Sequence, residues 1–86
     1  MTNLEMYKKI FMENFKVKED DLPKLQYQKN DLWDSIGHMD LIVDLEDAFE
    51  IQMMTPDVLD LTSYVKGKEV LEEYGIIIEK EETDDI

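Results

Sequence analysis

The stretch "DSIGHMDLIVDLEDAFEI", residues 34–51, carries the strongest structural signal in the chain. Its apolar side chains recur at the spacing i, i+1, i+4, i+7 and i+8, which places them on one face of an α-helix. These residues are Leu41, Ile42, Leu45, Ala48 and Phe49. The pattern predicts an amphipathic helix that begins at Ser35, ends near Phe49 and buries this face in a core.

Another side of this expected helix combines carboxylates with aliphatic groups. Met39 and Val43 share it with Asp40, Asp44 and Asp47. Such a mixture is unusual for a face that only meets solvent. It is typical of docking surfaces, where charges steer a partner and apolar groups hold it. The sequence therefore predicts a partner-binding face on this helix.

The segment before this helix divides into a helical part and a loop. Residues 2–15 carry an apolar stripe at helical spacing, and Thr2 and Glu5 have the spacing of a capping box. Residues 16–34 lose this periodicity, so we expect a long loop without regular structure, a kind of loop that is often functional. Trp33 is expected to anchor the loop by packing, since its ring is costly to leave in water.

The segment after it predicts two more helices. Thr55 followed by Pro56 is a helix start, because proline is favoured at the first helical position, and only about one turn follows. A last helix is expected over residues 63–74, with Gly75 as its C-terminal cap. The three isoleucines at 76–78 have no partner strand, so we expect them to tuck onto the helices as an apolar tail.

These elements define an all-α fold: a four-helix bundle of three longer helices and a short third one, with a long first loop. Residues 1–78 are expected to form one domain, and residues 79–86 a disordered acidic tail. The length of 86 residues suits a single domain with a modest core. No stretch approaches the roughly 20 apolar residues that a membrane-spanning helix needs. No signal peptide is recognisable, so a cytoplasmic protein is expected.

Charge is the dominant compositional feature, with a net charge of −13 at pH 7. Between Asn30 and Val65 lie nine carboxylates and no lysine. This charge argues against binding to nucleic acid or to an anionic membrane, and it predicts basic protein partners. The chain contains no cysteine, which excludes disulfides, thiolate nucleophiles and cysteine metal sites.

Two further chemistries find little support. A calcium-binding loop that begins at Asp31 would need oxygen ligands where Trp33 and Ile42 stand, so no metal site is expected. Ser35 and His38 are three residues apart and could touch on one helix face. However, a substrate pocket and an oxyanion hole are hard to build in so small a helical bundle, and we do not expect an enzyme.

Ser35 has two possible roles at this point. A serine at a helix N-cap normally accepts a hydrogen bond from a backbone N–H group of the first turn. The same place also tolerates an attached phosphodiester, because free N–H groups and the helix dipole stabilise an anion there. Position alone does not separate capping from attachment.

The stretch closely resembles the acyl carrier protein family around its attachment site. That family has Asp-Ser-Leu at the start of its second helix, and here Asp34-Ser35-Ile36 matches the triplet, with Ile in place of the usual Leu. Further matches are the apolar Leu41, Leu45, Phe49 and Ile51 and the acidic Glu46 and Asp47. The resemblance extends more loosely over residues 2–76. Many relatives have a glycine shortly before the Asp, where this chain has residues 31–33, Asp-Leu-Trp.

The resemblance implies a carrier of acyl or aminoacyl groups, held as thioesters on a 4′-phosphopantetheine arm. Ser35 would take up this arm from coenzyme A, and Asp34 would help the basic phosphopantetheinyl transferase to recognise its target. The partner-docking residues would be Ile36, Met39, Asp40, Val43, Asp44 and Asp47. The protein would be a monomer that visits several enzymes with basic surfaces. The alternative is an acidic helical adaptor that binds a basic protein through the same face without modification.

Overall fold

The structure, a computed structural model, describes residues 1–81 and is helical. Its elements are α1 (Asn3–Phe15), the 3-10 helix η1 (Glu19–Lys24), α2 (Ser35–Phe49), α3 (Thr55–Asp60) and α4 (Tyr64–Glu72). Within these residues no strand forms, and the extended pairing is limited to one isolated bridge between Gln26 and Ser63. The predicted all-α class is therefore confirmed.

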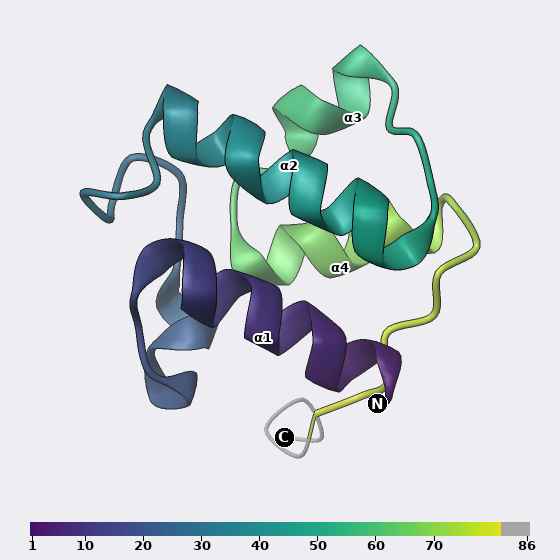
Figure 1. The fold of residues 1–86 in the computed structure, drawn as a ribbon, viewed down its shortest axis with the longest axis horizontal. Coiled ribbons are helices and arrows are strands. Elements are labelled where there is room, and N and C mark those ends of the chain that lie inside the picture. Colours follow the sequence, from purple (N-terminus) through teal and green to yellow (C-terminus); the bar gives the residue numbers. More distant parts are fainter. Residues whose placement is uncertain (82–86) are drawn as a thin grey trace.

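Figure 1 shows how these helices are arranged. α1 and α2 pack against each other, and α3 lies at the edge of the molecule away from α1. α4 contacts both α3 and η1, so it connects the two ends of the helical assembly. Across the described part of the chain, no helix is both long enough and apolar enough to cross a membrane.

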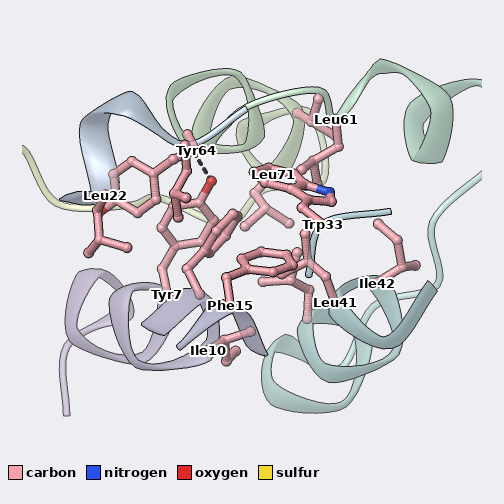
Figure 2. Packing of buried hydrophobic residues seen from close by; sticks show 14 of the residues in the cluster. Tyr7, Ile10, Phe15, Leu22, Trp33, Leu41, Ile42, Leu61, Tyr64 and Leu71 are labelled. Atoms are coloured by element: carbon pink, nitrogen blue, oxygen red, sulfur yellow. Dashed lines mark hydrogen bonds between the residues drawn. The ribbon is translucent and has the colours of Figure 1, made fainter. Parts of the chain in front are cut away.

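Aromatic rings fill the core (Figure 2). The largest fully buried side chains include Trp33, Tyr7, Tyr64, Phe11 and Phe15. The Trp33 ring stacks on Phe15 with centroids 4.7 Å apart, and Phe11 meets it edge-on at 5.6 Å. The Tyr7 hydroxyl donates to the backbone carbonyl of Tyr64 at 2.5 Å, so this buried polar group is paired. Trp33 thus anchors the loop before α2, as its size predicted.

The helix starts follow local capping. Thr2 is the N-cap of α1 and forms the predicted capping box with Glu5. Ser63 is the N-cap of α4, and its side chain accepts from the N–H of Lys66. α4 ends at Glu72, two residues earlier than expected, and the chain turns at Gly75, whose φ of 82° suits glycine.

The segment after α1 differs from the expectation. Residues 16–34 are not irregular throughout, because η1 forms within them. Its start is fixed by reciprocal hydrogen bonds between the backbone of Lys18 and Asp21, and Leu22 is fully buried against the core. The apolar periodicity of a 3-10 helix of only six residues is too short to stand out in the sequence.

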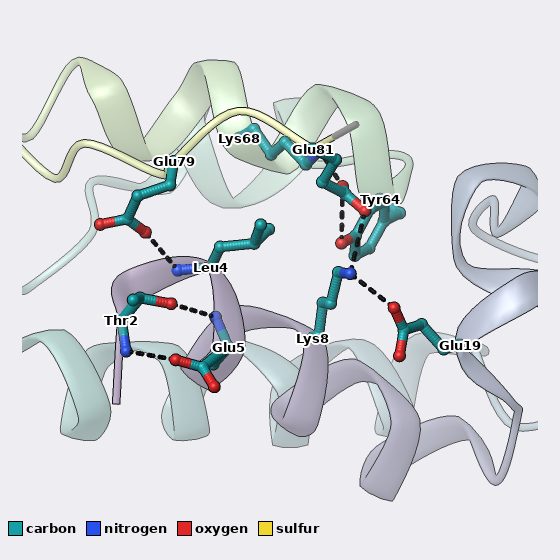
Figure 3. A network of polar contacts seen from close by, with 9 residues as sticks. All are labelled: Thr2, Leu4, Glu5, Lys8, Glu19, Tyr64, Lys68, Glu79 and Glu81. Carbon is teal, nitrogen blue, oxygen red and sulfur yellow. Dashed lines mark hydrogen bonds and ion pairs between the residues drawn. The ribbon is translucent and has the colours of Figure 1, made fainter. Parts of the chain in front are cut away.

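The C-terminal segment returns to α1. Ile78 is buried, as expected for an apolar tail, and the backbone N–H of Leu4 donates to Glu79 at 2.7 Å. Figure 3 shows Glu81 between Lys8 of α1 and Lys68 of α4, with the Tyr64 hydroxyl donating to it at 2.9 Å. Residues 79–81 therefore make ordered contacts where we expected the start of a solvated tail. The rest of that predicted tail, residues 82–86, lies outside the described residues.

Candidate functional site

Ser35 is the first residue of α2, and its side chain is exposed. The N-cap is Asp34 instead, whose Oδ1 accepts from the N–H of Gly37 at 2.8 Å. Of the two roles considered for Ser35, capping is therefore not the one that its side chain plays. The physical reason is that Asp is an equally good N-cap and stands one residue earlier. Among residues 1–81 no side-chain hydrogen bond involves Ser35, so its hydroxyl has no part in capping the start of the helix.

The loop before α2 folds closely over the first turn of the helix. A Cβ atom added to Gly37 would lie 1.9 Å from the carbonyl oxygen of Leu32, so no larger residue fits without a shift. The loop itself is held by Asn30, whose side chain accepts from the N–H of Leu32 and whose carbonyl accepts from the N–H of Trp33. Sequence reasoning missed this role of Gly37, because an isolated glycine near a helix start gives no sign of its neighbour.

His38 joins three segments of the chain. Its Nδ1 accepts a hydrogen bond from the Trp33 indole N–H at 2.9 Å, and its Nε2 lies 2.7 Å from the Val58 carbonyl oxygen in α3. Because the indole N–H can only donate and the carbonyl can only accept, these contacts fit the tautomer with an unprotonated Nδ1 and the proton on Nε2. Both nitrogens are thus engaged, and neither is free to take a proton from Ser35. The Ser35–His38 pair considered from spacing alone is not arranged as a nucleophile and its base.

The predicted docking residues lie exposed along one side of α2. The apolar ones are Ile36, Met39 and Val43, with 75%, 53% and 50% of their surface exposed. The acidic ones are Asp40, Asp44 and Asp47, all exposed. Asp44 also accepts from the side-chain amide of Asn14 in α1 at 2.8 Å. The structure thus brings all six residues together on the surface, beside Ser35.

The surface formed by residues 1–81 includes two hollows that bear on the site. One, of about 250 Å³, adjoins the start of α2 and is lined by Asn14, Leu32, Asp34, Ile36, Gly37 and Asp40. The larger one, of about 380 Å³, lies by α1, η1 and the C-terminal segment and shares no lining residue with the first. Of the two lysines that line it, Lys8 is paired with Glu19 and Glu81. We assign the smaller hollow to the candidate site because it adjoins Ser35 and is lined by its neighbours Asp34 and Ile36.

The region around Ser35 is strongly acidic. The nine carboxylates and the absence of lysine between residues 30 and 65 place α2 and α3 in a negative field. In the described part of the chain, three or more His, Cys, Asp or Glu side chains do not gather where a metal ion could be held. Comparisons with families of proteins, with curated proteins and with solved structures found no match for this chain.

Proposed function

We propose that this protein is an acyl carrier protein, with a 4′-phosphopantetheine arm attached to Ser35. The observation that carries the proposal is an exposed serine hydroxyl that plays no part in capping its helix, because Asp34 does so. A helix-starting serine without a structural role is available for attachment. The helix order supports the proposal, since a long connection follows α1 and α3 is short.

The start of α2 fits an attached phosphodiester. The backbone N–H groups of Ser35 and Ile36 belong to the first turn and have no intrahelical acceptor. Together with the helix dipole they stabilise a negative charge on the Ser35 oxygen. This local stabilisation offsets repulsion from neighbouring carboxylates such as Asp34 and Asp40.

The modification is a phosphoryl-type transfer to the Ser35 hydroxyl. The Ser35 oxygen attacks the phosphorus that bears the pantetheine group in coenzyme A, and the bond from that phosphorus to the bridging oxygen breaks. Adenosine 3′,5′-bisphosphate leaves, and the proton of the hydroxyl passes to a base of the transferase. The bound arm supplies a thiol for thioester formation. The chain itself has no cysteine, so no other thiol competes for the acyl group.

The side of α2 next to Ser35 supports short visits by several enzymes. Its carboxylates attract basic surfaces from a distance at a rate that salt reduces. Its exposed apolar groups, Ile36, Met39 and Val43, give a small contact area, which limits the lifetime of each complex. Cargo could be a fatty acyl, polyketide or aminoacyl group.

The mass of the intact protein tests the attachment. Incubation with coenzyme A, Mg²⁺ and a phosphopantetheinyl transferase of broad range should add one phosphopantetheine to the wild type. Ser35→Ala should gain nothing. Ser63→Ala is a matched control that removes a different helix-start serine, and it should still be modified. No gain by the wild type with several such transferases contradicts the proposal and favours the unmodified acidic adaptor.

Charge reversal tests the docking face. Asp40→Lys with Asp47→Lys should raise the KM of the transferase for this carrier at least about tenfold, because steering and contact are both lost. Asp44 stays unchanged, since it holds Asn14. The control, Glu69→Lys with Glu72→Lys on exposed positions of α4, changes net charge equally. Equal effects of both pairs would show that overall charge matters and this face does not.

A further inference from the structure

We propose that His38 is a positioning residue of the Ser35 site, which holds the preceding loop and α3 against the helical turn that carries the serine. Its effect on modification rests on the proposed function. Its effect on the position of the loop and α3 does not, and each part has its own measurement.

The first tie fixes the chain just before the serine. The Trp33 indole donates to His38 Nδ1, and the two rings lie nearly parallel, with an interplanar angle of 16°. Trp33 is fully buried against Phe15, so the imidazole is bound to a rigid part of the core. Only Asp34 separates Trp33 from Ser35 in sequence. The position of the serine is therefore set from both sides, through the loop and through the turn that contains His38.

The second tie holds α3. No residue of α3 is buried, whereas Met53 before it and Leu61 after it are. Between these two anchors, Val58 is the apolar residue of α3 that packs partly on the core, and its carbonyl accepts the His38 Nε2–H bond. At the N-terminal end of α3, the Tyr74 hydroxyl accepts from the N–H of Met54. The same hydroxyl donates to the side chain of Asp57 within α3 at 2.5 Å. α3 thus depends on hydrogen bonds more than a well-buried helix does, and His38 supplies the one to the Val58 carbonyl.

The two ties need an acceptor and a donor in one side chain. Neutral imidazole offers both, and the amide of glutamine offers both at a similar separation. Leucine fills comparable space with neither. His38→Leu leaves the Trp33 indole N–H and the Val58 carbonyl without their partner, and His38→Gln keeps a partner for each. This pair of variants therefore separates the hydrogen bonds of His38 from its volume.

Misplacement of Ser35 should lower kcat for modification rather than raise KM. In-line attack needs an aligned oxygen, and a shift of about 1 Å can cost up to about 100-fold in rate. The docking residues Ile36, Met39 and Asp40 point outward and keep their contacts. Simple destabilisation acts differently: it lowers the concentration of folded carrier, so the apparent KM rises and kcat at saturation is unchanged.

The structural part is tested on the full chain by nitrogen-15 NMR and hydrogen exchange, helped by the single His and single Trp. We expect His38 with an unprotonated Nδ1 and a protonated Nε2 at neutral pH. In His38→Leu the amides of α3 should exchange at least about tenfold faster, while those of α1 stay unchanged. His38→Gln should restore protection. An imidazole that averages between tautomers, or unchanged exchange in α3 of His38→Leu, overturns the inference.

The functional part uses transferase kinetics on the same variants. We expect His38→Leu to lower kcat at least about threefold with KM within about twofold, and His38→Gln to recover most of it. Equal kcat for wild type and His38→Leu, or a rise in KM alone, overturns the positioning of Ser35. Failure of the wild type to take up phosphopantetheine overturns the proposed function instead, and hydrogen exchange then decides whether His38 positions α3.

Discussion

Gly37 shows how one residue brings two segments together at the candidate site. In the first turn of α2 it has no side chain, so the loop carbonyl of Leu32 can approach the helix closely. The same backbone donates its N–H to Asp34, which caps the helix. The position of Ser35 therefore depends on a neighbour that contributes no side chain at all.

Replacing Gly37 with Ala should destabilise the protein. Helix propensity alone favours Ala by about 1 kcal/mol. However, the added methyl group would lie 1.9 Å from the backbone oxygen of Leu32, which cannot move by itself. Because overpacking of this kind typically costs about 1–3 kcal/mol, we expect a net loss in the free energy of unfolding, measured by urea denaturation and circular dichroism.

Val43→Ala is the control for this prediction. Val43 is half exposed in the same helix, and its replacement also raises helix propensity. Its effect should stay within about 0.5 kcal/mol. A Gly37→Ala variant more stable than the wild type would contradict the prediction, because it would show that the backbone at Leu32 moves away without a loss of stability.

Among the elements, the C-terminal segment joins α1 to α4 through Glu81. Burial by itself raises the pKa of Glu81, but hydrogen bonds from Lys68 and Tyr64 and the charge of Lys68 outweigh it. The pKa of this carboxyl is therefore lowered from its ordinary value of 4.5. Lys8 of α1 is ion-paired to the same carboxylate at 3.3 Å. The segment thus closes the molecule through a charged contact as well as through buried Ile78.

Glu81→Gln should lower stability most at neutral pH. A carboxyl with a lowered pKa in the folded state contributes stability above its unfolded pKa, and this contribution disappears as pH falls through the folded pKa. We expect a loss of about 1 kcal/mol at pH 7, since the side chain is only partly buried. The difference from wild type should shrink below pH 4.5, the ordinary value.

The measurement is urea unfolding at a series of pH values. Glu72→Gln serves as the control, because Glu72 is exposed on α4 and forms no ion pair or hydrogen bond through its side chain with other described residues. It should differ from wild type by less than about 0.5 kcal/mol at pH 7. If the loss in the free energy of unfolding of Glu81→Gln stayed the same at acidic pH, the charge of Glu81 would not be its cause.

For the whole molecule, net charge acts in opposite directions on stability and on association. A charge of −13 on 86 residues repels itself in the compact state. The same charge attracts basic partners toward the lysine-free part of the chain between residues 30 and 65. Screening by salt weakens both effects. Salt concentration therefore distinguishes the two effects: raising it should stabilise the fold and weaken partner binding.

Raising NaCl from about 20 mM to about 300 mM should raise Tm by about 2–5 °C, because the Debye length falls from about 20 Å to about 6 Å and self-repulsion weakens. The rate of Ser35 modification at low carrier concentration should fall over the same range. Tm is measured by calorimetry, with sucrose of equal osmolality as the control. A Tm that falls with salt would mean that attractive pairs such as Lys8 with Glu81 outweigh the repulsion.

Much of the helical layout could be predicted from neighbouring residues along the chain. The capping box of Thr2, the cap at Ser63 and the proline at position 56 act within one turn, and each marks a helix start where one is found. The apolar periodicity of α2 predicted its buried residues Leu41, Ile42 and Leu45. These features can be predicted from the sequence because they depend on interactions between residues three or four positions apart.

The sequence alone thus predicted the four α-helices, the acidic charge and Ser35 as the residue of interest, but not η1. It did not show that Asp34 takes over the cap, that Gly37 admits the loop, or that His38 connects Trp33 to α3. The His38 and Gly37 contacts bring together groups from separate segments, and their geometry exists only once the core has placed the indole. Whether the loop and α3 hold the turn that carries Ser35 was therefore a question of packing, which no local pattern contains.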